Sequence, residues 1–296
     1  MSAAALPARL EVHGATRSAL RAGATALGAL LLRDLVVLRK NFGEFALRTV
    51  IQPFLLCFVF LYVFPKIGQA VGGAAHRGAS AAASEAAFAT VLVAGVVGIS
   101  IMFQGVQSVA LQMSQEFGFT REIEDRVQAP CPIWLVAVAK VVSGSAQGMI
   151  SAAIVLPIAS VVHAQGVEAQ ISLHWWLIVT LVPLSCVAMS SLGLVLGTSF
   201  EPRNIGLMFG FVVLPITFLG GTYYEWTRLA PVTLGRFHWL QTLVLVNPLI
   251  YVNEGMRAAF TDAGHMHLYV IYPVLVGFCA VFLVIGLRNF RGRVLS

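Results

Sequence analysis

The chain has 296 residues, of which 58% are hydrophobic and 11% are charged. A soluble domain carries about a quarter charged residues, so this composition excludes an ordinary water-soluble fold and predicts an all-α integral membrane protein. The formal charge of +6 comes from short basic clusters beside apolar segments. Because these clusters form no continuous stripe, they favour a role in membrane orientation and argue against a nucleic-acid partner.

Before the first long apolar segment, residues 27–42 carry leucines at helical spacing, with Arg33 and Lys40 on the opposite side. This pattern predicts an amphipathic helix on the cytoplasmic membrane surface, within an N-terminal cytoplasmic segment of residues 1–45. A helix packed against a soluble partner is the alternative.

Six segments are long enough to cross a bilayer, which takes about 20 mostly apolar residues. The sequence therefore predicts a six-span transmembrane domain over residues 46–287 and a tail of residues 288–296. When the connections alternate between two sides, 14 of the 19 Lys and Arg residues fall on one side. This excess predicts that both termini lie in the cytoplasm of a multi-pass plasma-membrane protein. The predicted spans are residues 46–64, 87–112, 134–163, 174–198, 205–223 and 267–287.

Spans two and five contain uncharged polar residues, which suit an amphiphilic or sugar cargo better than an ion. Helix packing explains the same residues equally well. The candidates for a translocation path are Gln104, Gln107, Ser108 and Thr217.

The connection of residues 113–133, between spans two and three, is densely charged and ends in two prolines. Ile123 and Val127 lie one helical turn apart in it, so a short helix would present apolar side chains within a charged rim to a soluble protein. A merely solvated loop is the alternative. The residues predicted to contact the soluble protein are Glu116, Arg121, Glu122, Ile123, Glu124, Asp125 and Arg126.

Charge is scarce inside the predicted spans, and none carries Asp or Glu in its central third. Proton or ion coupling through this chain is therefore poorly supported. Lys140 and Arg48 lie near the cytoplasmic ends of their spans, where we expect their long side chains to reach the membrane surface.

The segment of residues 224–266, between spans five and six, is apolar enough in part for a seventh span. Asn247 and Pro248 interrupt this part, and a seventh span would place the basic tail outside. We expect instead a re-entrant outer hairpin of two short helices, with Pro248 in the first turn of the second helix.

The sequence contains only weak candidates for a catalytic, nucleotide-binding or metal site. No G-x-x-x-x-G-K-[ST] phosphate loop is present, so energy for uphill transport must come from another protein. His265 and His267, near Asp262, form a weak metal-like pattern, and we expect no metal site and no enzymatic activity of the chain itself.

Three stretches, in this order and spacing, resemble the permeases of ABC-2 type exporters. Residues 31–41, LLRDLVVLRKN, followed by Gln52-Pro53, are similar to the interfacial helix and first span of that family. Residues 121–144 are similar to its acidic loop, Ala-Pro and the start of its third span. The third stretch, FLGGTYYEWTRLAP and VNPLIYVNEGMRAAF, matches the family's outer loop and Asn-Pro helix at Gly221, Asn247, Pro248, Glu254 and Arg257. After the first glycine of this outer loop, the chain departs from the short polar turn that is usual in the family.

The resemblance implies that two permeases, as a homodimer or with a related second chain, form a twelve-span unit in a bacterial inner membrane. Each would dock one cytoplasmic ABC ATPase, so that two ATPase subunits bind ATP and Mg while this chain carries no cofactor. The cargo path would run between the permeases and carry a drug, a glycolipid or a polysaccharide outward. An ATP-independent six-span channel or scaffold protein and an intramembrane enzyme are the alternatives.

Overall fold

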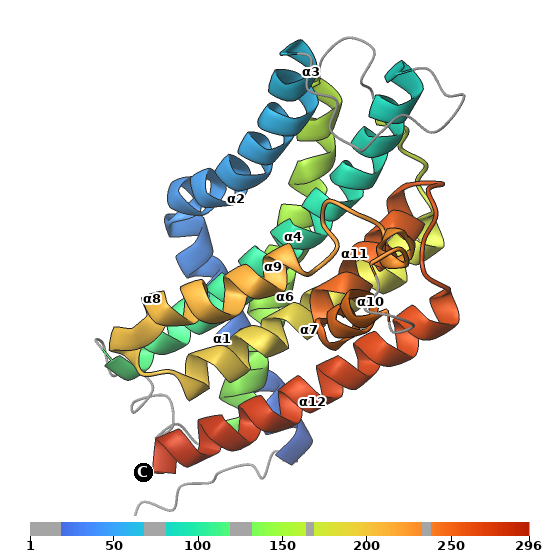
Figure 1. Cartoon of the computed structure of the whole chain (residues 1–296). Coiled ribbons are helices and arrows are strands. Elements are labelled where there is room, and N and C mark those ends of the chain that lie inside the picture. Colours follow the sequence, from blue (N-terminus) through green and yellow to red (C-terminus); the bar gives the residue numbers. More distant parts are fainter. Residues whose placement is uncertain (1–18, 68–80, 119–131, 164–168, 233–237, 296) are drawn as a thin grey trace, which may run out of the picture.

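The computed structural model describes residues 19–67, 81–118, 132–163, 169–232 and 238–295, in which all regular structure is helical (Figure 1). Five of the described helices are long and apolar enough to cross a membrane, and they correspond to five of the six predicted spans. These are α2 (Phe42–Cys57), which continues through a π-helical turn (Phe58–Val63) into α3 (Phe64–Lys66), and α4 (Ala81–Gly118), α6 (Ile133–Val161), α7 (Trp175–Ser199) and α12 (Leu268–Leu295).

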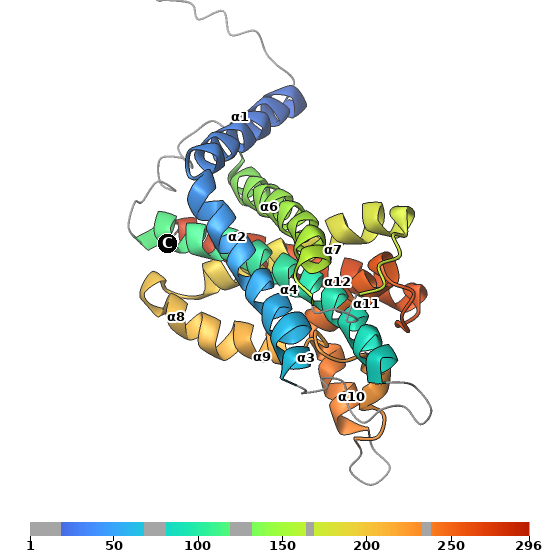
Figure 2. The same cartoon turned by 90° about the horizontal axis from the view of Figure 1, so that it is seen from above.

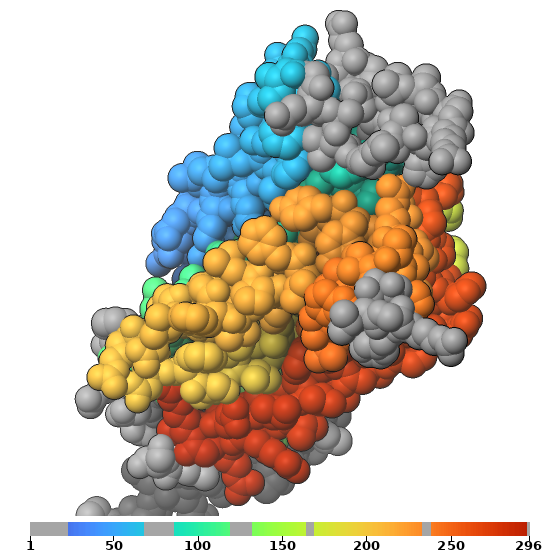
Figure 3. Space-filling view, in the orientation of Figure 1, coloured from blue at the N-terminus to red at the C-terminus, as the bar shows by residue number. Residues whose placement is uncertain are grey.

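The predicted fifth span, residues 205–223, is a shorter apolar helix, Pro202–Phe218. It ends there because Gly220 and Gly221 follow, and Gly221 has a φ of 69°, a left-handed conformation that glycine adopts without steric cost. The predicted span ran past this glycine pair because the prediction rested on apolar composition alone. The helix comprises a 3-10 turn (Pro202–Asn204), α8 (Ile205–Met208), a π-helical turn (Phe209–Val213) and α9 (Leu214–Phe218), and it crosses the face shown in Figure 3 between α2 and α12.

Two helices widen into a π-helical turn immediately before a proline. The amide of Phe64, just before Pro65, bonds to the carbonyl of Val59, five residues earlier. The amide of Leu214, just before Pro215, also bonds five residues back. In a regular α-helix a proline ring clashes with the carbonyl four residues before it, and the wider turn relieves this clash.

The central helix α4 contacts α2, α6, α7 and α11 (Pro248–Phe260). It meets α7 at Gly193 and Gly197, which lie one turn apart. A Cβ atom at Gly193 would lie 3.0 Å from the carbonyl oxygen of Gly105, and one at Gly197 would lie 2.9 Å from Cα of Ala110. Small residues at this spacing allow the backbones of two membrane helices to approach closely.

The bundle has two opposite ends. At the first, which we call the loop end, the last turns of α4, α7 and α12 meet near α1 (Ala19–Lys40) (Figures 1 and 2). There the rings of Phe117 and Phe290 lie 5.9 Å apart, and Arg293 donates a hydrogen bond to the carbonyl of Phe200 at 2.8 Å. The second end, which we call the hairpin end, contains α11 and α10 (Trp239–Leu243).

The two short helices predicted around Asn247 and Pro248 are present. The first is α10, continued by a 3-10 turn (Val244–Val246), and the second is α11, which begins at Pro248. Asn247 caps α11 because its Oδ1 accepts a hydrogen bond from the amide of Leu249 at 2.9 Å. Every residue of α11 is buried, since the helix packs among α4, α7 and α12.

Candidate functional site

A cleft of about 390 Å³ lies at the loop end between α1, α2, α4 and α6. Its lining is largely polar and combines cations, carboxylates and amides. Arg48 is an exposed cation at this cleft. The charged residues that line it are Arg33, Asp34, Glu44, Arg48, Glu116 and Lys140.

Lys140, in the first turns of α6, is the most buried charge of the cleft. Only 4% of its side chain is exposed, and its Nζ lies 3.0 Å from Oε1 of Glu116 and 3.4 Å from Oδ1 of Asp34. It also donates a hydrogen bond to Oε1 of Gln112 at 3.3 Å. Paired carboxylates compensate the cost of removing an ammonium group from water. The Asp34–Glu116–Lys140 triad therefore joins α1, α4 and α6.

The side chain of Lys140, which we expected to reach the membrane surface, is buried among α1, α4 and α6. Asp34 of α1 and Glu116 of α4 supply two carboxylates inside the bundle, and together they hold the ammonium group there. The Asp34 contact joins residues 106 positions apart in the chain, which no local pattern reveals.

Three of the predicted path residues lie on one side of α4, at or behind the cleft. Gln107 and Ser108 line the cleft. Gln104 is buried one turn deeper, where its Oε1 accepts a hydrogen bond from Thr49 and its Nε2 donates one to Gln147, both at 3.2 Å. A chain of polar side chains thus connects α2, α4 and α6 behind the cleft.

Thr217, the fourth predicted path residue, belongs to a different part of the bundle. It is buried in α9, and its hydroxyl donates a hydrogen bond to the carbonyl of Val213 at 2.8 Å. A local backbone bond of this kind satisfies the hydroxyl within its own helix.

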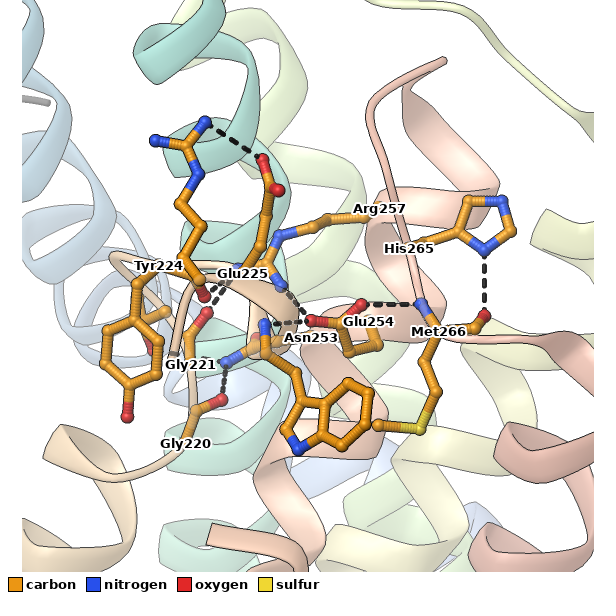
Figure 4. A network of polar contacts seen from close by, with 12 residues as sticks. Gly220, Gly221, Tyr224, Glu225, Asn253, Glu254, Arg257, His265 and Met266 are labelled. Atoms are coloured by element: carbon orange, nitrogen blue, oxygen red, sulfur yellow. Dashed lines mark hydrogen bonds and ion pairs between the residues drawn. The ribbon is translucent and has the colours of Figure 1, made fainter. Parts of the chain in front are cut away.

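A second polar group lies at the hairpin end (Figure 4). Glu254 and Arg257, one turn apart on α11, form an ion pair of 2.6 Å with side-chain exposures of 2% and 0%. The Oε1 atom of Glu254 also accepts a hydrogen bond from the amide of Trp226 at 3.0 Å, and its Oε2 accepts one from the amide of Met266 at 2.8 Å. One carboxylate therefore holds the segments before α10 and before α12 against α11.

Arg257 extends the same network toward the end of the predicted fifth span. Its Nη2 donates hydrogen bonds to the carbonyls of Gly221 and, at 2.8 Å, Tyr224. Burial lowers the pKa of the Arg257 guanidinium, whereas the nearby charges of Glu254 and Glu225 raise it. The buried charge is compensated by the carboxylate and by two carbonyls that the glycine turn directs at it.

Two asparagines of the hairpin also bind the end of the predicted fifth span. Asn253 donates from Nδ2 to the carbonyl of Gly220 at 2.6 Å, and Asn247 donates from Nδ2 to the carbonyl of Ile216 at 2.7 Å. Sequence reasoning did not single out Asn253, although its position beside Glu254 in an otherwise apolar helix was a usable signal. The predicted outer-segment residues Gly221, Asn247, Pro248, Glu254 and Arg257 thus lie on α11 or against it.

Comparison with known proteins connects these features to a family. The model of the ABC-2 type transporter family matches residues 25–261, which include both ends of the bundle. The chain belongs to the ABC-2 type transporter family. The match confirms the resemblance recognised in the sequence, and it identifies the chain as a membrane component of an ABC transporter, which works with an ATPase.

Individual ABC-2 relatives support the same assignment. The chain is 30% identical over 198 residues to the inner membrane transport permease YadH of Escherichia coli strain K12, covering 66% of this chain and 71% of the relative. It matches the proteins of the same name from Escherichia coli O6:H1 and Shigella flexneri with the same identity and coverage.

In this ABC-2 chain the structure places one of the predicted ATPase-contacting residues. Glu116 lies in the last turns of α4, with 7% of its surface exposed, and is held by Lys140. The others, Arg121, Glu122, Ile123, Glu124, Asp125 and Arg126, lie outside the described residues, so their role stays a prediction.

The histidines near the start of α12 have local partners. Nδ1 of His265 lies 2.8 Å from the carbonyl of Met266, and the ring of His267 stacks on that of Tyr269 at 5.1 Å. Within the part of the chain that the structure describes, no three His, Cys, Asp or Glu side chains gather as metal ligands would.

Proposed function

We propose that this chain is the membrane-spanning permease subunit of an ATP-driven exporter in a bacterial inner membrane. The relatives of this chain are inner membrane transport permeases, which supports transport across an inner membrane. The observation that carries the proposal is the Asp34–Glu116–Lys140 triad, because it ties the last turns of α4 to both α1 and α6. Residues 119–131 follow directly, so a force applied to them would reach three helices at once.

We place six spans in the membrane, with the loop end and both termini in the cytoplasm and Pro202–Phe218 as the fifth span. The excess of Lys and Arg at the loop end supports this orientation. Trp175, Trp176 and Trp239 are exposed toward the other end, as interfacial aromatic residues are.

The hairpin is re-entrant in this placement. Gly98 of α4 packs against the hairpin at Asn253, and Gly95 packs against Thr222 in the turn that leads into the hairpin. A Cβ atom at either glycine would collide with these residues. At 1.5 Å per residue, these glycines lie roughly 12 and 17 Å inside the predicted span that begins at residue 87. The hairpin then reaches into the outer leaflet, where its polar groups need partners within the protein, as the Glu254–Arg257 network provides.

Two copies of a cytoplasmic ABC ATPase are the proposed partners, one for each permease. They carry ATP and Mg, and the charged segment of residues 119–131 is the proposed contact. Closure of the ATPases around ATP would displace this segment, and the triad would transmit the displacement to α1 and α6.

A second permease is proposed to pack against the face shown in Figure 3, where α2 and Pro202–Phe218 lie. On α2 and the π-helical turn that continues it, the rings of Phe54, Phe58 and Tyr62 stack in a row, with centroids 5.9 and 5.4 Å apart, and all three are exposed. On the neighbouring helix, Leu207 and Phe211 are exposed. A homodimer would bring two such faces together about a twofold axis.

The proposed cargo is an amphiphile, such as a drug, a glycolipid or a lipid-linked polysaccharide. The polar cleft at the loop end can accept a head group, and the apolar faces of α2 and Pro202–Phe218 can accompany an apolar tail. Gln107 and Ser108 are the proposed contacts for the head group.

Co-purification with the cognate ATPase tests the proposal. Reversing the charges of Glu122, Glu124 and Asp125 to lysine should abolish the association. The matched control is Glu201→Lys, an exposed acidic residue in the connection between α7 and Pro202–Phe218 at the same end, which should leave the association intact. The proposal fails if the unaltered chain does not bind an available cognate ATPase, or if it transports cargo without one.

A further inference from the structure

A second cavity lies at the loop end, between the start of α6 and the last turns of α12. Its volume is about 500 Å³, and it shares no lining residue with the polar cleft. Four lining residues are apolar or aromatic and two are arginines, with no carboxylate among them. The lining consists of Ile133, Trp134, Leu287, Arg288, Phe290 and Arg291.

The two arginines of this cavity have no protein partner among the described residues. Arg288 and Arg291 lie one turn apart on α12, and both are exposed. Arg293, on the same helix, is engaged instead: it donates a hydrogen bond to Phe200 and lies 4.9 Å from the ring centre of Phe117. Two adjacent cations beside an apolar cavity are therefore suited to bind an anion that carries an apolar group.

We propose that this cavity binds one anionic phospholipid of the cytoplasmic leaflet. Arg288 and Arg291 would hold the phosphate, because guanidinium groups bind phosphate oxygens with paired hydrogen bonds. An acyl chain would lie along Ile133, Trp134 and Leu287.

The position of the cavity along the helices supports a lipid. The predicted apolar span of α12 ends at residue 287, so the two arginines follow where head groups begin. Trp134, which is 55% exposed, stands at the corresponding level of α6, as interfacial tryptophans do. The inference depends on the membrane placement proposed above, but not on the ATPase or the cargo.

Fluorescence quenching tests the inference on the full-length protein. The protein is reconstituted into phosphatidylcholine vesicles that contain rising fractions of brominated phosphatidylglycerol or brominated phosphatidylcholine. The signal of Trp134 is obtained by difference from a Trp134→Phe variant. We expect phosphatidylglycerol to quench Trp134 at a lower mole fraction, by about fivefold for each arginine that contacts the phosphate.

Matched variants separate this site from general attraction to a basic surface. Arg288→Gln with Arg291→Gln should remove the preference, whereas Arg288→Lys with Arg291→Lys should keep most of it. Arg39→Gln with Lys40→Gln removes the same charge from exposed positions of α1 and should leave the preference unchanged.

Two results would overturn the inference. One is equal quenching of Trp134 by the two lipids in the unaltered protein. The other is an equal loss of preference in the Arg39/Lys40 and Arg288/Arg291 glutamine variants. If the Arg288/Arg291 glutamine variant does not fold, the unaltered protein and the lysine variant decide the question.

Discussion

Buried charges hold this protein together at both ends of the bundle. At the loop end, Lys140 pairs with carboxylates from two other helices. At the hairpin end, Glu254 and Arg257 neutralise each other and bind four backbone groups of neighbouring segments. A buried ion pair adds little net stability, but the loss of one partner is costly, so such pairs fix which segments must lie together.

Removal of the cation at position 140 should weaken the loop end. In a Lys140→Met variant, Glu116 and Asp34 would face each other with no cation between them. We expect the free energy of unfolding to fall by about 3–5 kcal/mol, the usual cost of breaking a buried pair. Thermal unfolding in detergent measures this change as a lower midpoint. Lys40→Met, at an exposed position of α1, is the control and should change the midpoint little; equal midpoints for the two variants would contradict the structural role of the triad.

Helices were the features most accessible to prediction. Long apolar segments correctly predicted five helices that are long and apolar enough to cross a membrane, and the Asn247–Pro248 pair correctly predicted where α11 begins. The end of the helix Pro202–Phe218 was missed, because hydropathy does not register the backbone conformation of Gly221. The carboxylate partners of Lys140 and the Gly221 and Tyr224 carbonyls bound by Arg257 were missed for a different reason: residues distant in the chain meet there, and only packing brings them together.

The contact between α4 and the turn that leads into the hairpin gives a prediction with a matched control. Gly95→Ala would place a methyl group against the carbonyl of Thr222. Alanine favours helix by about 1 kcal/mol over glycine, yet we expect a net loss of about 1–3 kcal/mol from overpacking, seen as a lower thermal midpoint. Gly210→Ala meets nothing within 4 Å and should not lower the midpoint. A Gly95→Ala variant as stable as the unaltered protein would show that the turn at Thr222 does not pack tightly on α4.

The two ends of the molecule differ in how their polar groups are arranged. The loop end combines the polar cleft, the triad and the origin of residues 119–131, and the hairpin end is closed by a network with almost no solvent exposure. Membership of the ABC-2 type transporter family implies that this chain works with an ATPase. The arrangement favours the loop end as the point where that ATPase acts, because charges there connect α1, α4 and α6 next to the charged segment of residues 119–131.

Chemical cross-linking in membranes that contain the cognate ATPase tests this central claim most directly. Single cysteines would replace Glu122, in the proposed contact segment, or Thr227, an exposed residue at the hairpin end. The parent chain carries Cys131→Ser and Cys279→Ser, since Cys279 is only half-buried, whereas Cys57 and Cys186 are buried. A short thiol-to-amine reagent should join the ATPase to the cysteine at position 122 and not to the cysteine at position 227. A product from position 227, or none from position 122 while the ATPase is bound, would contradict the account.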